Sequence, residues 1–534
     1  MFHQILAPTG SLWSTILLAL VPLACLLFML AGLRITAWLA TIIASVITLA
    51  VGILAWHAPV NNALEAYLYG ALQGGWIINW ITFWGLIIFN TLVLTGDFDK
   101  FKEWLVRHAT MDVRIQTILL AWAFGALLEG LVGFGYPWAV VVPILVGLGI
   151  TDLEAIRVAA LANNAPVSYG ALGSPILALA AVTGLPLLQL SASVSDIVAV
   201  LALLPPFVLI FLVSGWDGMV EAWPLALVGS FSYILGQWPV GHYLGPYLPD
   251  ISGGLVSFWI VFIFVKVWRP KNIRGFGGKI ISAAEEAEAE AKGAEISGFR
   301  EWLPFLVLLV VVVIWTGPWS KLPAISWYKV STTAISSVTD KPILSTFSFN
   351  PFIGGSAILV TWIVIVLLLR PSVTTIKQVF ARTAKQWWGA CLVAFFTFGI
   401  AYTFVFTGMA NSLAYGLSKL GWVFVVFCPI LGWIGVALTG SNTSTNAMFA
   451  PIQAVAGKLL GLPVLLAPSL NSVGAEVGKP IAPQTASVGV STSKLVRSEG
   501  QVIRHNMGWT LIFLAYLIGI GLLFYLVLPF TMTM

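Results

Sequence analysis

Long apolar stretches separated by short polar ones dominate the chain. Stretches such as 14–33, 35–56, 197–213, 303–319 and 510–528 are nearly free of charge, and they fall in the range of about 17–25 residues that lets a helix cross a bilayer. The pattern predicts about twelve such helices, near 14–33, 35–56, 67–95, 115–131, 193–213, 218–237, 251–268, 302–319, 352–369, 387–408, 421–439 and 507–530. The sequence therefore predicts an all-α polytopic membrane protein.

Four further apolar stretches are interrupted by polar and glycine-rich motifs: 136–150, 155–181, 446–461 and 464–490. The motifs read FGALLEGLVGFGYP (124–137), NNAPVSYGALGSPI (163–176), IGVALTGSNTSTNA (434–447) and LNSVGAEVGKPIAPQ (470–484). Backbone exposed by a helix break is tolerated at membrane depth only where it lines a cavity or is buried in protein. We expect breaks at the glycines of these motifs, namely Gly130, Gly133, Gly135, Gly173, Gly440 and Gly478.

The motifs form two copies that lie about 310 residues apart. Gly130 aligns with Gly440, and Asn164 and Gly173 align with Asn471 and Gly478. The segments LVLTGDFDKFKEW (92–104) and FVFTGMANSLAYG (404–416) extend the similarity. A duplication of this length is typical of the two halves of a transporter, with the solute site at the interface of the repeats.

Charge predicts that the two copies have opposite orientations. The loop after the first copy's leading helix is basic, whereas the matching loop of the second copy contains only Lys419. The basic residues of the first loop are Lys100, Lys102, Arg107 and Arg114. Positive charge marks cytoplasmic loops, so we expect inverted-topology repeats whose broken or re-entrant helices meet at mid-membrane. The basic clusters 266–279, 370–385 and 494–504 are cytoplasmic in the same count, and both termini are then extracytoplasmic.

These patterns divide the chain into five segments. We expect a first transmembrane repeat at 1–190, intervening helices at 191–268, a cytoplasmic linker at 269–300, a second repeat at 301–505 and a final helix at 506–534. The linker contains AAEEAEAEAKGAE, a hydrophilic run without an apolar stripe. The polar stretch 320–350 is expected to be an external loop.

Composition narrows the functional classes. The chain is 59% hydrophobic and 9% charged, whereas about 25% of the residues of a soluble protein are charged. We therefore expect the chain to be embedded in the lipid bilayer. The net charge of +5 lies in loops and is no nucleic-acid footprint. The three cysteines and five histidines have no ligand spacing, and no catalytic motif is found. We therefore expect no metal, no cofactor and no enzyme activity.

Glu129 is the first candidate for chemistry, because it is a carboxyl inside an apolar segment. A charge at mid-bilayer costs about 2.5–3.5 kcal/mol on insertion scales. Glu129 is therefore expected to face a polar cavity, to pair with a cation or to be protonated, and a proton-coupling role follows. The alternative is a structural carboxyl that binds the backbone of a broken helix.

The run SNTSTN places small polar side chains where a helix would start again after a break. Helix N-termini attract anions, so Ser441, Asn442, Thr443, Ser444 and Asn446 are candidates for binding a carboxylate. Capping without solute contact remains the alternative. Asn163, Asn164, Ser168 and Tyr169 of the first copy can bind a hydroxyl or carboxylate, or can join helices by hydrogen bonds.

Lys479 can neutralise a bound anion, with Gln484 as a further hydrogen-bonding group. It can instead pair with Glu476, three residues before it, if that turn is helical. Glu476 is the second candidate for proton coupling.

The four motifs resemble the lactate permease family, which also includes glycolate permeases, and the resemblance runs through both halves. It implies import of L-lactate, D-lactate or glycolate with a proton across the inner membrane of a bacterium or archaeon. It further implies that Glu129 is the glutamate of the family's EG element, that Ser441, Asn442, Thr443 and Ser444 belong to its TGS-N/D-TS element, and that Lys479 and Gln484 belong to its GK…PQ element. The sequence departs from the pattern we expect of the family at Tyr136 and Glu476.

The expected function is symport of a small 2-hydroxymonocarboxylate with a proton. A carrier of another small organic anion that is sodium-coupled or uncoupled remains open, because carbonyls freed at helix breaks also bind Na⁺. A channel or a non-transporting membrane subunit is a third class. The repeated broken helices and the lone buried carboxyl argue against it.

Overall fold

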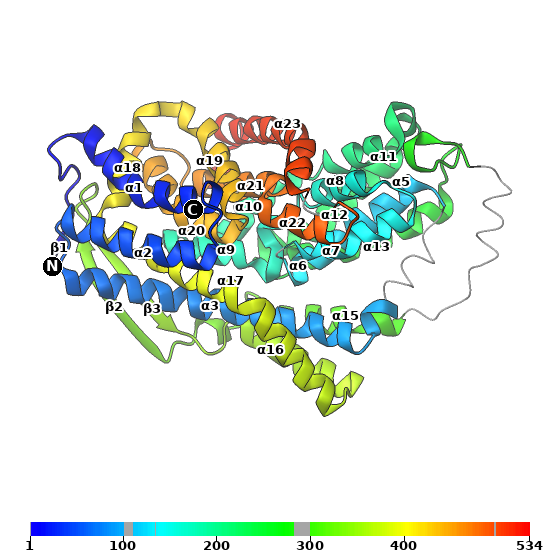
Figure 1. The fold of residues 1–534 in the computed structure, drawn as a ribbon, viewed down its shortest axis with the longest axis horizontal. Coiled ribbons are helices and arrows are strands. Elements are labelled where there is room, and N and C mark those ends of the chain that lie inside the picture. The colour runs from blue at the N-terminus through cyan, green and yellow to red at the C-terminus, as the bar shows by residue number, and fades with distance from the viewer. Residues whose placement is uncertain (1, 101–110, 134, 282–298, 496–497, 534) are drawn as a thin grey trace.

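A computed structural model of the chain describes residues 2–100, 111–133, 135–281, 299–495 and 498–533 (Figure 1). By length and composition, nine helical segments of these described residues can cross a membrane, or up to ten if a bent pair of helices counts as one span. The protein is therefore a multi-pass membrane protein built almost wholly of helices, which confirms the predicted fold class.

The helices divide into those before and after the linker. The first set is α1 (Leu12–Ala31), α2 (Ala37–Leu54), α3 (Val60–Leu94), α5 (Val113–Gln116), α6 (Phe124–Leu131), α7 (Tyr136–Gly147), α8 (Asp152–Ala162), α9 (Gly170–Thr183), α10 (Leu187–Leu201), α11 (Pro205–Glu221), α12 (Trp223–Tyr243) and α13 (Pro249–Val267). The second set is α15 (Phe299–Thr316), α16 (Gly354–Leu369), α17 (Val373–Thr407), α18 (Met409–Leu417), α19 (Phe424–Thr439), α20 (Asn442–Leu459), α21 (Leu466–Gly478), α22 (Pro483–Ser491) and α23 (Glu499–Leu526).

Some predicted boundaries are wrong for identifiable reasons. The predicted helix at 193–213 is two helices, α10 and α11, because Pro205 and Pro206 lack the N–H groups that would continue α10. Helix α17 is much longer than the predicted 387–408, and α3 begins seven residues before the predicted 67–95; each has 35 residues. At 1.5 Å per residue each spans about 52 Å, so their polar first turns extend beyond the hydrocarbon layer and escape a hydropathy window.

The predicted external loop at 320–350 contains a β-hairpin instead. Strands β2 (Tyr328–Ile335) and β3 (Pro342–Phe349) pair antiparallel, with Tyr328 opposite Phe349. Strand β1 (Phe2–His3) adds in parallel to β2. Gln4 then donates from Nε2 to the carbonyls of Val405 and Phe406, at 2.7 and 2.9 Å. The N-terminal strand is thus fastened to the end of α17.

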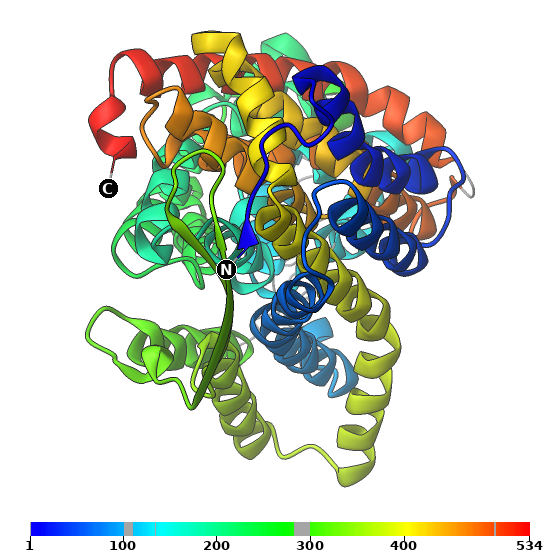
Figure 2. The same ribbon diagram turned by 90° about the vertical axis from the view of Figure 1, so that its left-hand side faces the viewer.

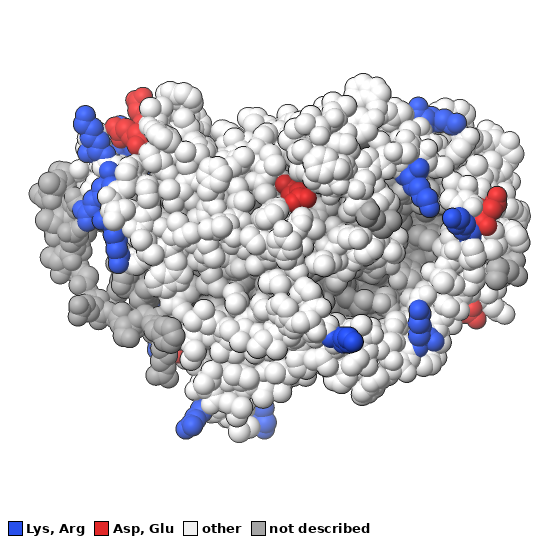
Figure 3. Space-filling model, turned by 180° about the vertical axis from the view of Figure 1, so that it is seen from behind, with Lys and Arg blue, Asp and Glu red and all other residues white. Residues whose placement is uncertain are grey.

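The two ends of the molecule differ. The hairpin and both chain ends lie in the left half of Figure 1, and Figure 2 looks onto this end. Helices α5 and α11 lie toward the opposite end. On the face in Figure 3, charged side chains gather mainly toward the two ends of the long axis, and uncharged surface covers most of the area between.

A buried ion network at the second end fixes the start of the linker. Arg114 donates to Asp112 Oδ2 at 2.6 Å, to Glu221 Oε2 at 3.2 Å and to the carbonyl of Asn272 at 2.6 Å. Arg274 binds both oxygens of Glu221, at 2.8 and 2.9 Å, and this carboxylate raises the pKa of the Arg274 guanidinium. Residues 269–274 are therefore anchored to α5 and α11. Most of the predicted linker, together with Lys102 and Arg107, lies outside the described residues.

Hydrogen bonds also show which helix ends lie together. Asp152 at the start of α8 accepts from the backbone N–H of Lys494 at 2.8 Å, and Glu154 contacts His505 of α23 at 2.9 Å. The loop after α20 instead meets the C-terminus, where the N–H of Leu465 donates to the carbonyl of Met532 at 3.0 Å.

Helices α3 and α17 pack closely along one another. A Cβ atom added at Gly70 would lie 2.6 Å from the carbonyl oxygen of Phe398, and one at Gly74 would lie 2.7 Å from the Cβ of Phe398. Small residues allow such close approach of helices in membranes. The pair forms one wall of the site described next.

Candidate functional site

Two helical hairpins turn at the motif glycines. The α6–α7 turn contains Gly133 and Gly135, with φ of 66° and 79°, and the α19–α20 turn contains Gly440, with φ of 73°. Only glycine adopts this backbone conformation without strain. A Cβ at Gly135 would lie 2.9 Å from Thr485 Cγ2, and one at Gly440 would lie 2.5 Å from Gln484 Oε1. Both turns therefore meet at the start of α22.

The first half contributes a second break, between α8 and α9, where the chain bends by 67°. Ala171, Leu172 and Gly173 all have positive φ, at 46°, 57° and 78°. A left-handed backbone at residues other than glycine costs about 1–3 kcal/mol each and clusters at functional sites. A Cβ at Gly133 would lie 2.9 Å from the Cβ of Ala171, so this strained turn packs against the first hairpin.

Two of the six predicted breaks fall differently. Helix α6 continues through Gly130 to Leu131, so Gly130 does not break it. A Cβ there would lie 2.7 Å from the Cβ of Asp250, which shows that Gly130 serves close packing. Gly478 is the last residue of α21, where the chain changes to the 3₁₀ turn Lys479–Ile481, and a Cβ there would lie 2.7 Å from the carbonyl oxygen of Trp433.

At the centre of the converging breaks lies a buried ion pair between the two halves. The ammonium of Lys479 donates to Glu129 Oε1 at 2.5 Å, and the side chains are 7% and 2% exposed. Asn163 donates to the other carboxylate oxygen at 3.1 Å. A Cβ at Gly170 would lie 2.6 Å from Glu129 Oε1, so glycine makes room for the carboxylate. The pair contains Lys479 and Glu129, rather than Lys479 and Glu476.

The ion pair lines a small cavity of about 30 Å³. The strained turn and the start of α20 supply the other walls, through Ala171, Ser174, Pro175, Ser441, Asn442 and Thr443. Ser441 caps α20 by accepting from the N–H of Ser444 at 3.2 Å. A cation, a helix N-terminus and a carboxylate thus face one space, which is the chemistry required to bind an anion and hold a proton.

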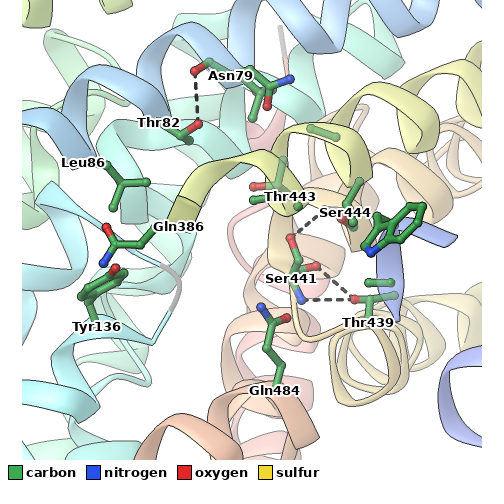
Figure 4. Close-up of a pocket in the computed structure, with 17 residues that line it drawn as sticks. Asn79, Thr82, Leu86, Tyr136, Gln386, Thr439, Ser441, Thr443, Ser444 and Gln484 are labelled. Atoms are coloured by element: carbon green, nitrogen blue, oxygen red, sulfur yellow. Dashed lines mark hydrogen bonds between the residues drawn. The ribbon is translucent and has the colours of Figure 1, made fainter. Parts of the chain in front are cut away.

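A larger cavity of about 410 Å³ adjoins the small one, and Ser441 and Thr443 line both. Its polar wall includes Thr439, Ser444 and Gln484 (Figure 4). Helices α3 and α17 supply much of the opposite wall, including Asn79, Thr82, Leu86 and Gln386, and Tyr136 comes from the start of α7.

Asn446, predicted to bind solute, is instead engaged by protein on three sides. It donates to the carbonyl of Pro175 at 3.0 Å and to Ser472 Oγ at 3.1 Å, and it accepts from Asn471 at 2.9 Å. It is fully buried and lines neither cavity. Its contacts join α9, α20 and α21 by hydrogen bonds, whereas the alternative that the sequence left for this run was capping.

The other polar candidates of the first copy line neither cavity. Ser168 donates to Glu476 Oε2 at 2.6 Å, and Tyr169 donates to the carbonyl of Ser191 at 2.5 Å. Asn163 contacts Glu129, whereas both polar side-chain atoms of the buried Asn164 have no hydrogen-bond partner among the described residues. Glu476 is fully buried and lines neither cavity.

Sequence reasoning overlooked one buried acid. Asp250, at the start of α13, is 1% exposed and accepts from Tyr233 at 3.0 Å. It packs against Gly130 and lies near Glu129 and Glu476. Its sequence context, YLPDISGG, places a carboxyl at the start of an apolar helix, where it resembles an ordinary helix-capping residue.

The chain is similar to known permeases along nearly its whole length. The family described as L-lactate permease matches residues 15–528. The glycolate permease GlcA of Escherichia coli K12 is 34% identical over 97% of this chain and 96% of its own. L-lactate permeases of Salmonella typhimurium and Bacillus subtilis are each 32% identical, over 96% and 95% of both chains.

Among solved structures, the YdaH transporter of Alcanivorax borkumensis is similar at a TM-score of 0.49, with 15% identity over 93% of this chain and 99% of that chain. MtrF of Neisseria gonorrhoeae is similar at a TM-score of 0.42, with 14% identity over 94% and 97%.

Proposed function

Because the chain belongs to the L-lactate permease family, a family of permeases and not of enzymes, we propose that it imports L-lactate, and D-lactate or glycolate, by proton symport across the inner membrane. The observation that carries the proposal is the Glu129–Lys479 pair, which faces the N-terminus of α20 across the small cavity. The solute is a small 2-hydroxymonocarboxylate.

Lys479 and the first turn of α20 hold the solute carboxylate. The positive end of α20 and the Lys479 ammonium both favour an anion. The hydroxyls of Ser441 and Thr443 and the amide of Asn442 line the same space and can bind the 2-hydroxyl. Gln484 and Ser444 line the adjoining cavity, through which the solute reaches this position.

Proton coupling follows from competition for one cation. When the solute carboxylate binds Lys479, Glu129 loses its ionic partner while it remains buried. Removing one partner of a buried ion pair costs about 3–5 kcal/mol, and protonation of Glu129 removes this cost. The solute anion and the proton therefore bind together. If either one left alone, Lys479 or Glu129 would again be a buried charge without a partner.

One proton with one monovalent anion moves no net charge. The membrane potential, which is worth about 2.3 kcal/mol per charge per 100 mV, then gives no direct drive. A pH gradient contributes about 1.4 kcal/mol, or tenfold accumulation, per unit. Purified protein in liposomes is the test: lactate uptake should follow an inwardly directed proton gradient and ignore a potassium–valinomycin potential.

The alternative, a sodium-coupled or uncoupled carrier, gives a different result in the same vesicles. Uptake that requires a sodium gradient at equal pH would show sodium coupling in place of proton coupling. Uptake driven by the membrane potential at fixed pH would reject the proposed stoichiometry of one proton per anion.

The same proposal includes two inverted repeats, 1–190 and 301–505, with both termini outside the cytoplasm. Its support is that α5 starts beside the basic 269–274 segment, whereas the loop after α20 meets the C-terminus. The intervening segment 191–268, the linker 269–300 and the last helix within 506–534 complete this division. A reporter enzyme that is active only outside the cytoplasm, fused to the C-terminus, should be active.

A further inference from the structure

The larger cavity exceeds the needs of the proposed solutes. Besides the hydroxyl and the carboxylate, C2 of glycolate carries only hydrogen and C2 of lactate carries one methyl group, yet a cavity of about 410 Å³ lies beside the carboxylate position. Pockets of about 300–1,000 Å³ are typical of drug-sized ligands. The two cavities adjoin at the start of α20, where Ser441 and Thr443 line both.

The larger cavity has polar side chains on both walls, and its apolar side chains come mainly from α3 and α17. Ser441, Thr443 and Gln484 lie together on one side of the cavity (Figure 4), and Ser441 and Thr443 also line the small cavity of the ion pair. The wall from α3 and α17 combines the polar Asn79, Thr82 and Gln386 with apolar side chains, among them Ile78, Leu86, Val393 and Ala394. A molecule with its carboxylate beside Lys479 and its hydroxyl on α20 directs its C2 substituent toward these apolar side chains.

We propose that the wall of α3 and α17 is the binding surface for the C2 substituent, and that the protein also accepts 2-hydroxymonocarboxylates with larger aliphatic substituents, such as ethyl and isobutyl. This inference rests on the proposed function and adds a substrate class to it. Each further buried methylene improves binding up to about fourfold, the equivalent of about 0.8 kcal/mol.

Gly389 allows the inference to be tested by filling the cavity. It lies on α17 in the lining, and a Cβ added there would meet no atom within 4 Å. A side chain at this position therefore projects into open space without displacing a neighbour. Gly508 on α23 is a matched control, because a Cβ there also meets nothing, while the residue is exposed and lines neither cavity.

The experiment is counterflow of radiolabelled lactate in proteoliposomes, with competition by glycolate, 2-hydroxybutyrate and 2-hydroxyisocaproate. In the natural protein, both larger acids should compete at half-inhibitory concentrations no higher than that of lactate, because their added methylenes are buried. In Gly389→Leu, the ratio of the half-inhibitory concentration of 2-hydroxyisocaproate to that of glycolate should rise at least tenfold. Gly508→Leu should leave the ratio unchanged, and Ala390→Leu, which fills the same cavity, serves if Gly389→Leu does not fold.

The possible outcomes distinguish a failure of the proposed transport function from a failure of the proposed binding surface. Absence of both lactate and glycolate counterflow would refute the proposed function. Lactate counterflow with exclusion of the larger acids would overturn this inference alone, as would an unchanged ratio in folded cavity-filling variants.

Discussion

Replacing Glu129 by Gln separates solute binding from proton coupling. The amide preserves the size of the side chain, and its oxygen can still accept from Asn163, as the carboxylate does at 3.1 Å. It cannot accept a proton in transport, and it leaves Lys479 without the oxygen that now lies 2.5 Å away. In the empty site of the variant, Lys479 is thus a buried cation without its partner.

The magnitude follows from this lost pair. Removing one partner of a buried ion pair costs about 3–5 kcal/mol, and a bound solute carboxylate would recover part of that cost. Because the ammonium borders a cavity that admits water, we expect a recovery of about 1–2 kcal/mol, which is about a five- to thirtyfold tighter half-saturation in counterflow. Accumulation should fall from about tenfold per pH unit to none.

The assay uses proteoliposomes in two modes, pH-driven accumulation and equilibrium counterflow. The control is Glu476→Gln, since Glu476 is equally buried but binds Ser168 and lines neither cavity. This control should retain pH-driven accumulation. Intact accumulation in Glu129→Gln would refute the coupling mechanism, and its loss only in Glu476→Gln would assign the proton to Glu476.

Three further predictions test the site and its packing. Lys479→Gln should raise the half-saturation for lactate at least tenfold in counterflow, because a hydrogen bond to a charged group contributes about 1.5–3 kcal/mol; an unchanged value would remove Lys479 from the carboxylate site. Asn446→Ala should lower thermal stability in detergent by about 2 kcal/mol, since three interhelical bonds at about 0.6 kcal/mol each are lost, whereas Asn62→Ala, which loses one bond to Thr332, should lower it by less. Gly130→Ala should cost about 1–3 kcal/mol from overpacking against Asp250 and the backbone N–H of Ile251, and equal stability of Gly130→Ala and Gly508→Ala would contradict that packing.

The sequence was sufficient for the membrane class and for the regions of the breaks because both depend on local composition. Apolar length identifies a membrane helix, and clustered glycines identify a turn within the membrane, as at Gly133, Gly135 and Gly440. The β-hairpin was missed because the Ser and Thr residues of its two strands resemble a polar loop, and the third strand of the sheet comes from the far N-terminus. The lengths of α3 and α17 were missed because their polar ends resemble loops.

The partner of Lys479 could not be predicted from spacing. Glu476 is three residues away, and Glu129 is 350 residues away. The change from α-helix to 3₁₀ turn at Lys479 directs the ammonium toward α6, and only the packed arrangement brings the two halves together there. The positive φ of Ala171 and Leu172 was equally hidden, because the sequence shows no glycine at either position.

The close seating of α3 against α17 has a mechanical consequence. At Gly70 and Gly74 of α3, the absence of a side chain lets α17 pack directly on the backbone. Separating the two helices would therefore leave unfilled space along them. We therefore expect α3 and α17 to move, or to stay in place, as one rigid unit. If transport requires helices to slide, we expect the movement between this rigid pair and the two hairpin turns, beside Gln484 and Tyr136.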